Sequence, residues 1–222
     1  MEFKLFMENG RIHNKSNIVI LGASGHGKVV ADIALLNGYG QIFFLDDDIS
    51  KHENGMYPVV GTISDFLRSY TAENMSESNF DVFIAIGNNS IRKQIAEQLP
   101  VQPVTLIHPE AVIDRTAIIG CGSVVMAGAI VNADARIGNG CIINTGASVD
   151  HDCVLGDHVH ISPGAHIAGT TNIGEKTWFG VGSCCVNNVN IAADCVVGAG
   201  AVVIGDITES GIYVGCPAVR VR

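Results

Sequence analysis

Basic residues, aromatic residues and long apolar runs are all scarce in this chain of 222 residues. With 13 Lys and Arg against 22 Asp and Glu, the formal net charge is −9, and such a chain repels nucleic-acid backbones and anionic lipid. No apolar run reaches the roughly 18 residues that a membrane-spanning helix needs, and the acidic start has no signal-peptide core. We therefore expect neither nucleic-acid nor membrane partners.

The cysteines show no pairing pattern. The chain has seven of them, an odd number, and no paired C-x-x-C spacing. Without an export signal this usage indicates reduced thiols and a cytoplasmic protein. Aromatic residues make up only 6% of the chain, so its 47% apolar content rests on small aliphatic side chains, and this much apolar surface excludes a disordered chain.

A six-residue repeat fills the second half of the sequence. A large, mostly aliphatic residue recurs every six positions from Ile113 to Val203 without a slip, and a small or β-branched residue follows four positions after each. This period fits neither an α-helix nor a heptad. It predicts a three-sided coil of short parallel strands, in which each turn adds one strand to each face, about 4.8 Å from the last. Four cysteines fall on inward positions of this coil: Cys141, Cys153, Cys185 and Cys195.

The first half of the sequence alternates strand and helix patterns. We expect strands over 17–21, 41–45, 81–86 and 104–107, and helices over 28–37, 62–70 and 90–99. This order predicts a Rossmann-like α/β domain with a parallel sheet and right-handed crossovers. The chain then divides into a loose arm at 1–16, the Rossmann-like domain at 17–107, the coil at 108–208 and a cap at 209–222.

Three polar loops follow the expected strands of this domain: Gly22-Ala-Ser-Gly-His-Gly27, Asp46-Asp47 and Gly87-Asn88. In parallel sheets such loops meet at the carboxyl ends of the strands, where ligands bind. Glycines and a helix N-terminus suit a phosphate, and a carboxylate accepts sugar hydroxyls, so the loops fit a nucleotide or nucleotide sugar. The G-x-x-G-x-G spacing differs from the G-x-G-x-x-G dinucleotide motif, which disfavours NAD. Tight turns without a ligand are the alternative.

His151 lies in an expected corner of the coil, between Asp150 and Asp152. A neighbouring carboxylate makes a neutral imidazole a good proton acceptor near pH 7, and a solvated turn is an equally weighted alternative. From where histidines usually lie in proteins, we expect His158 and His160 to be ordinary exposed turn residues. Three repeats, or 18 residues, complete one turn of the expected coil, so residues 18 positions apart lie above one another. No two histidines of the repeat have this separation, so one chain cannot stack them into a metal site, and a zinc site would need several chains.

Several short motifs accompany the uninterrupted hexapeptide repeats: Gly22-Ala-Ser-Gly-His-Gly27, Leu45-Asp-Asp47, Ile86-Gly-Asn-Asn89, Asn144-Thr145, Val149-Asp-His-Asp-Cys153 and Gly215-Cys-Pro-Ala218. With these motifs the chain resembles, from Asn17 to Val219, a family of bacterial sugar acetyltransferases. The family includes PglD-like bacillosamine-pathway N-acetyltransferases and NeuD-like sialic-acid O-acetyltransferases. The resemblance implies a left-handed parallel β-helix, a homotrimer, acetyl-CoA in the groove between two subunits, and a nucleotide sugar on the N-terminal domain.

The resemblance also implies roles for single residues. His151 would be the general base and Asp152 the carboxylate that raises its basicity, while His160 and Gly169 would contact acetyl-CoA near its thioester. Nucleotide-sugar contacts are implied for six residues: Ser24, Gly25, His26, Asp46, Asp47 and Gly87.

We therefore expect an acetyl-CoA-dependent N-acetyltransferase that modifies the amino group of a nucleotide-activated 4-amino deoxysugar, for surface glycan or protein glycosylation, without a metal. The expected mechanism is direct transfer. Covalent catalysis by Cys153 is the alternative, disfavoured because its position is a core one. O-acetylation of sialic acid or another sugar is the nearer alternative function. A hexapeptide-repeat zinc carbonic anhydrase and a non-catalytic sugar-nucleotide scaffold are the others.

Overall fold

A computed structural model describes residues 17–71 and 80–222, so the arm expected at 1–16 lies outside the described residues. The chain divides into two compact units, an N-terminal unit up to Leu106 and a coil unit from Ile107 onward, and each is described by itself. No helix of the described residues is both long and apolar enough to cross a membrane.

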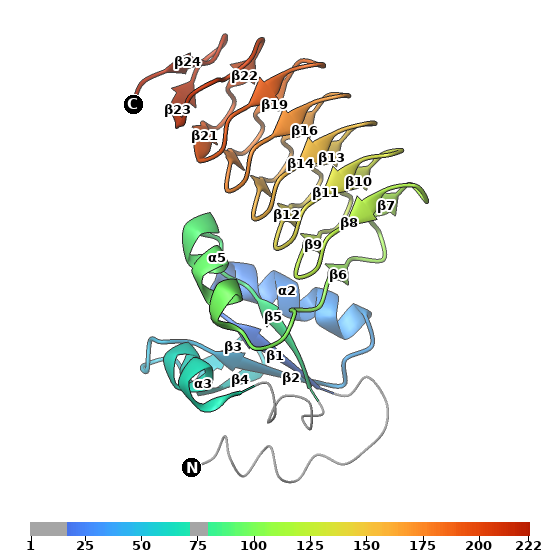
Figure 1. Ribbon diagram of the computed structural model, residues 1–222. Helices are drawn as coiled ribbons and strands as arrows, with labels where there is room; N and C mark the ends of the chain where they lie inside the picture. The colour runs from blue at the N-terminus through green and yellow to red at the C-terminus, as the bar shows by residue number, and fades with distance from the viewer. Residues whose placement is uncertain (1–16, 72–79) are drawn as a thin grey trace. The chain divides into compact units, whose positions relative to one another are not determined.

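The N-terminal unit contains a five-stranded sheet and the helices α2, α3 and α5 (Figure 1). Its elements are β1 (Asn17–Leu21), α2 (Gly25–Leu36), β2 (Gln41–Leu45), β3 (Glu53–Asn54), β4 (Tyr57–Gly61), α3 (Ile63–Ser69), β5 (Phe80–Ile84) and α5 (Asn89–Gln98). The sheet order β3-β4-β2-β1-β5 places β1 between its parallel partners β2 and β5. β4 extends the parallel sheet beyond β2, and β3 pairs with β4 in the antiparallel sense.

Both faces of the central strand β1 are covered. Asn17–Leu21 are buried without a break, as expected for a strand inside a parallel sheet. Val19 and Leu21 pack with residues of α3 and α5, whereas Ile18 and Ile20 point to the opposite face and are also fully buried. α2 contacts β1 and β2. The covered parallel sheet confirms the predicted α/β domain.

Two predictions for this unit are wrong. The segment 104–107 contributes only β6 (Leu106–Ile107), which joins a sheet of the coil, so the fourth parallel strand of the N-terminal sheet is β4. That strand forms a short hairpin with β3, and its sequence lacks a clear alternating pattern. α2 begins at Gly25 rather than at Lys28, because the Ser24 carbonyl already accepts a helical hydrogen bond from the Lys28 amide at 3.1 Å.

The coil unit is a parallel β-helix with three faces (Figure 1). The first face holds β7 (Val112–Ile113), β10 (Ile130–Val131), β13 (Ser148–Val149), β16 (His166–Ile167), β19 (Cys184–Cys185) and β22 (Val202–Val203). The second face holds β8 (Ile118–Ile119), β11 (Arg136–Ile137), β14 (Val154–Leu155), β17 (Asn172–Ile173) and β20 (Asn190–Ile191). The third face holds β6, β9 (Val124–Val125), β12 (Ile142–Ile143), β15 (His160–Ile161), β18 (Trp178–Phe179), β21 (Cys195–Val197), β23 (Gly211–Val214) and β24 (Val219–Arg220).

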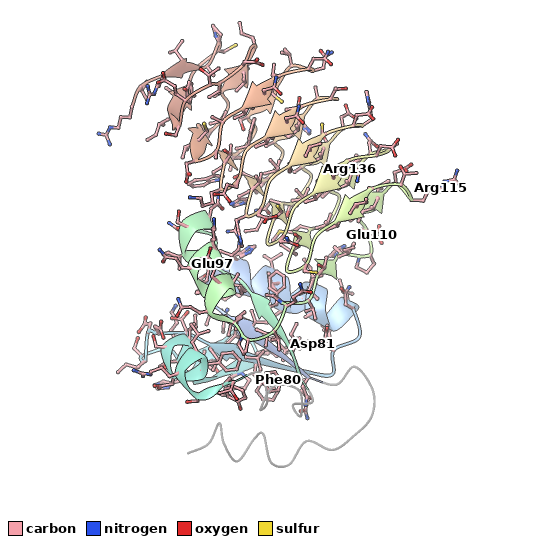
Figure 2. The ribbon with its side chains drawn as sticks, viewed as in Figure 1. Phe80, Asp81, Glu97, Glu110, Arg115 and Arg136 are labelled. Carbon is pink, nitrogen blue, oxygen red and sulfur yellow. The ribbon has the colours of Figure 1, made fainter. Side chains whose placement is uncertain are left out.

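Inward side chains form one continuous core along the coil. In the two-residue strands of the repeats the second residue points inward, so Val131, Val149 and Ile167 stack in successive turns of the first face. The four cysteines assigned to inward positions are at most 6% exposed, and all seven cysteines are free thiols. Arg115, in a corner, points away from the coil (Figure 2), and Arg136, on β11, is exposed. The predicted inward and outward positions are confirmed.

Two sets of special residues form the corners of the coil. Most corners contain a residue with a left-handed backbone three positions after the inward residue, and about half of these are not glycine. A second set of glycines directly follows the inward residue. A Cβ built on Gly120 would lie 2.6 Å from the carbonyl carbon of Gly138, and one on Gly174 would lie 2.3 Å from the Ala193 nitrogen. These glycines let neighbouring turns approach closely.

The segment 209–222 closes the sequence with two strands. β23 continues the third face in parallel with β21, and β24 returns antiparallel to β23. Arg220 forms an ion pair with Glu209 at 2.6 Å and donates a hydrogen bond to the Ser210 carbonyl at 2.8 Å. Its side chain therefore ties β24 to the residues that precede β23.

Replacing Ile161, which is fully buried in the coil, by Ala removes packed methyl groups and leaves a cavity. We expect the free energy of unfolding to fall by about 2–5 kcal/mol. Denaturant unfolding followed by circular dichroism at one protein concentration measures the change. Ile204→Ala, at a position that is 62% exposed, is the control and should cost less than about 0.5 kcal/mol. Equal losses in the two variants would contradict the inward assignment.

Candidate active site

The three polar loops of the N-terminal unit meet beyond the carboxyl ends of β1, β2 and β5. The Ala23 amide donates a hydrogen bond to the Asp46 carboxylate at 2.8 Å, which joins the first loop to the second. A Cβ built on Gly22 would lie 2.6 Å from Ile86 Cδ1 and 2.9 Å from the Ala85 carbonyl oxygen, so the first and third loops are in contact. The loops therefore form one surface.

The glycines of the first loop meet two different needs. Gly22 has a φ of 113°, and a Cβ on Gly27 would lie 2.3 Å from the Gly22 carbonyl oxygen, so close packing excludes side chains at both positions. A Cβ on Gly25 would meet nothing within 4 Å. Ser24 precedes α2 without a side-chain capping bond, and the first turn carries no acidic residue. The first amides of α2 are therefore suited to an anionic ligand.

Both predicted carboxylates of the second loop accept hydrogen bonds from the protein. Asp46 accepts from Lys51 Nζ at 2.9 Å and from the Asp48 amide at 3.0 Å. Desolvation raises the pKa of Asp46, but these hydrogen bonds outweigh it and hold the pKa below its usual value. Asp47 accepts from the Ser64 amide at 2.9 Å, at the start of α3. Asp46 thus links the loops, whereas Asp47 is directed toward α3.

His26 lies in the first turn of α2 and is neutral at physiological pH. Desolvation, followed by the positive charge of Arg92, lowers the pKa of His26 to about 4. Its Nε2 atom is buried and has no hydrogen-bond partner among the described residues. Burying such an atom without a partner costs free energy, so this imidazole is suited to bind a polar group of a ligand.

Arg92 is a residue of this surface that the sequence analysis missed. The side chain, on α5, is 1% exposed, and its guanidinium donates to the Ile86 carbonyl at 2.9 Å and to Asn89 Oδ1 at 2.8 Å. A third bond reaches the Gly87 carbonyl at 3.3 Å. Arg92 therefore fixes the loop that carries Gly87. Its burial could have been predicted from the sequence, because Arg92 stands three residues before the buried Ile95, on the inward side of the helix.

In the coil unit, His151 and Asp152 lie in a corner between β13 and β14. The His151 Nδ1 and Asp152 Oδ2 atoms are 2.8 Å apart. Asp152 has a left-handed backbone with a φ of 59°, which Asp tolerates, and its amide donates to the Ala133 carbonyl at 3.0 Å. The Thr170 amide donates to the His151 carbonyl at 2.9 Å. Backbone bonds to the turns on either side therefore hold this corner in place.

The His151–Asp152 pair is arranged for proton transfer. Because a carboxylate can only accept, Nδ1 carries the proton and Nε2 is left as the acceptor. The hydrogen bond to Asp152 and the nearby negative charges raise the pKa of His151 above its usual value. The two side chains are 60% and 58% exposed, so a substrate can reach Nε2. Gly169, in the following turn of the coil, lies against the imidazole.

His160 lies on β15 and is 9% exposed, and His158 is 7% exposed, so the prediction that both are exposed turn residues is wrong. The burial of His160 is explained by Trp178, the next residue along the third face, whose indole stacks on the imidazole with ring centroids 5.8 Å apart. His160 Nε2 is 3.1 Å from Asn144 Nδ2, and Trp178 Nε1 donates to Ser162 Oγ at 2.7 Å. The sequence analysis also missed Trp178, the only tryptophan.

One chain does not bring His151 and His160 together. His151 lies in a corner that joins the first face to the second, whereas His160 lies on the third face, which is opposite that corner in a three-sided coil. A site that uses both side chains must therefore take them from two coils.

Cys153 lacks the properties of a nucleophile. The side chain is fully buried, and its thiol donates to the Ala168 carbonyl at 3.3 Å. Burial raises the pKa of the Cys153 thiol, which keeps it protonated and inert. Among the described residues, no three or more His, Cys, Asp or Glu are grouped so that they could hold a metal ion.

Two family models match the two units. Residues 17–99 match the PglD N-terminal domain, and residues 134–169 match the bacterial transferase hexapeptide in six repeats. A parallel coil with these repeats is the left-handed β-helix of hexapeptide transferases, so the fold and the His–Asp corner define a hexapeptide-repeat acyltransferase.

Individual relatives narrow this class. The acetyltransferase domain of PglB from Neisseria gonorrhoeae FA1090, also solved with acetyl coenzyme A, is 44% identical with a TM-score of 0.86 over 94% of this chain and 100% of that one. PerB from Caulobacter crescentus, solved with CoA and GDP-perosamine, is 36% identical with a TM-score of 0.81 over 92% of this chain and 96% of its own. The chain belongs to the PglD-like family of hexapeptide-repeat acetyltransferases, as its motifs predicted.

A curated relative, UDP-N-acetylbacillosamine N-acetyltransferase from Bacillus subtilis (strain 168), matches over a shorter stretch. It is 39% identical over 115 residues, which are 50% of this chain and 51% of the relative. The match thus spans about half the length of that protein.

Replacing Asp152 by Asn keeps a residue that tolerates the left-handed backbone but removes the carboxylate. Because the bond to Asp152 is the main cause of the raised pKa of His151, that pKa should fall toward its usual value. NMR titration of isotope-labelled histidine, with the His151 signal assigned from His151→Ala, measures the shift. Asp150→Asn, which removes a weaker influence, should produce a smaller fall. An unchanged His151 titration in Asp152→Asn would contradict the assignment.

Proposed function

We propose that this chain is an acetyl-CoA-dependent N-acetyltransferase acting on the 4-amino group of a nucleotide-activated deoxysugar, such as UDP-4-amino-4,6-dideoxy-N-acetylglucosamine. The observation that carries the proposal is the exposed His151–Asp152 pair, in a family whose members have been solved with acetyl-CoA and with an amino-sugar nucleotide. Relatives named as N-acetyltransferases favour an amine over a sialic-acid hydroxyl as the acceptor.

In the catalytic step, His151 acts as the general base. Its Nε2 takes a proton from the sugar amine as the amine nitrogen bonds to the thioester carbonyl carbon of acetyl-CoA. The tetrahedral intermediate then collapses, the C–S bond breaks, and the CoA sulfur leaves with a proton returned by the imidazolium. Asp152 stabilises the imidazolium through Nδ1. The oxyanion of this intermediate accepts a hydrogen bond from His160 or from a backbone amide. Gly169, like His160, contacts acetyl-CoA near its thioester.

The loops of the N-terminal unit bind the nucleotide sugar. The uncapped start of α2, with Ser24 and the unobstructed Gly25, suits its phosphates. The neutral His26, with its unpartnered Nε2, supplies a hydrogen bond without adding charge. Asp46 and Gly87 belong to the same surface, because the Ala23 amide joins the first loop to Asp46 and Gly22 packs against Ile86, the residue before Gly87. Asp47 acts indirectly, because it accepts a hydrogen bond from the Ser64 amide and so fixes the second loop to the start of α3.

The active assembly is a homotrimer with sites between neighbouring coils. His151 and His160 lie on opposite sides of one coil, so a second chain is needed to complete a site that contains both. Outward apolar side chains on the two faces beside the His151 corner suit burial against such a copy: Val112, Ile118 and Val154, each more than 40% exposed. Holding two substrates in line at this boundary supplies much of the acceleration. The free thiols support a cytoplasmic location.

A substrate panel tests the proposed activity. Purified protein is incubated with acetyl-CoA and either a UDP-, GDP- or dTDP-linked 4-amino sugar, or CMP-linked or free sialic acid, and the released CoA thiol is measured. We expect release with at least one 4-amino sugar nucleotide and none with sialic acid. Release with sialic acid alone would contradict N-acetylation. Tight binding of a sugar nucleotide without any CoA release would identify a non-catalytic scaffold.

Two variants in one corner separate direct transfer from a covalent mechanism. His151→Ala should lower kcat by about 10²–10⁴-fold, because it removes the general base. Cys153→Ala should keep kcat near the wild-type value and reduce only the free energy of unfolding, since this thiol is packed in the core. Steady-state kinetics on the best sugar of the panel measure both. The reverse pattern, with Cys153→Ala inactive and His151→Ala active, would establish a covalent route instead.

A further inference from the structure

Gly169 lies directly beside the imidazole of His151. A Cβ built on Gly169 would be 2.6 Å from both Cε1 and Nε2 of His151 and 3.1 Å from its Cδ2. Side-chain carbons do not pack this closely, so the ring occupies the space that the side chain of any other residue would need. The Gly169 backbone is outside the left-handed region, so conformation does not require glycine here. The required feature is the free space above its Cα.

Other glycines of the coil differ from Gly169 in what requires glycine there. A Cβ on Gly140 would lie 2.5 Å from the imidazole of His158, but Gly140 has a left-handed backbone, which by itself favours glycine. A Cβ on Gly174 would collide with the backbone nitrogen of Ala193, so that glycine serves the stacking of turns. A Cβ on Gly205 would meet nothing within 4 Å, and its backbone is also outside the left-handed region. At Gly169 the nearest atoms belong to one exposed side chain, which can move without disturbing the coil.

We propose that Gly169 is a positioning residue for His151, an inference that rests on the proposed role of His151 as general base. The bare backbone of Gly169 lets the imidazole lie back against the following turn of the coil. In that orientation Nδ1 meets the Asp152 carboxylate at 2.8 Å, and Nε2 lies at the surface of the coil above Gly169. The resemblance implied only a contact with acetyl-CoA for this glycine. The packing adds a second role, because the backbone of Gly169 forms the surface against which the imidazole of His151 packs, and we call this surface the seat of His151.

A methyl group at position 169 would push the ring off this seat. Rotation of the His151 side chain then lengthens the bond to Asp152 and moves Nε2 away from its position. A displacement of about 1 Å in a reacting group can cost as much as 10²-fold in rate. The fold should be unaffected, because the collision involves a side chain that is 60% exposed and no backbone atom of another turn.

The variant Gly169→Ala in the full chain tests the inference. We expect kcat to fall about 10- to 100-fold while the KM for acetyl-CoA stays near the wild-type value. The pKa of His151, measured by NMR titration, should fall toward its usual value because its bond to Asp152 is weakened. Gly205→Ala should leave kinetics, titration and stability unchanged. Gly174→Ala should lower the free energy of unfolding, which separates damage to the coil from displacement of the base.

A double variant distinguishes the positioning of His151 by Gly169 from a direct contact between Gly169 and acetyl-CoA. If Gly169 acts only through His151, adding Gly169→Ala to His151→Ala should not lower the residual rate or the affinity for acetyl-CoA further. A wild-type kcat in Gly169→Ala, or a change confined to the KM for acetyl-CoA, would overturn the inference while leaving the proposed function intact. A wild-type kcat in His151→Ala would refute the general base itself, and with it the role of its seat.

Discussion

Parallel backbone hydrogen bonds between successive turns of the hexapeptide repeats set each side chain above another that is 18 residues away in the sequence. This register decides what each functional residue contacts. It places His151 between Ala133 and Gly169, and it places the ring of His160 under the indole of Trp178. Because inward residues are close-packed and corner residues are bonded to both neighbouring turns, a corner side chain such as His151 stands on a rigid base.

Two histidines of the chain have their protonation shifted in opposite directions, and each shift suits a different task. Desolvation and the charge of Arg92 keep His26 neutral, so it can form a hydrogen bond to a ligand without titrating. The exposed His151 is paired with Asp152, which favours the imidazolium that forms when a proton is accepted. The first environment favours binding and the second favours chemistry. Each arises from a few local contacts within its own unit.

The sequence predicted what strict repetition imposes. An inward position every six residues must be apolar, so the coil, its core cysteines and the exposed corner at His151 could be read without a structure. Features that depend on a single contact outside the repeat pattern could not be predicted in this way. Burial of His160 follows from Trp178 on the next turn, and the order of the N-terminal sheet follows from the short strand β4, whose sequence is not distinctive. The role of Arg92 needed the positions of three carbonyl and amide oxygens. The proposed catalytic roles rest on the resemblance, because the spacing alone fits a solvated turn at His151 as well as a catalytic base.

The central claim is that a single active site uses His151 of one chain and His160 of another. Its most direct measurement is the activity of mixed assemblies made by co-expressing His151→Ala and His160→Ala chains with different affinity tags. Each variant alone should lose most of its activity, whereas a mixed assembly of the proposed homotrimer has one boundary with both histidines intact, so purified mixtures should recover about one third of wild-type activity. If mixed assemblies are no more active than the two parents, the two side chains do not meet across a subunit boundary.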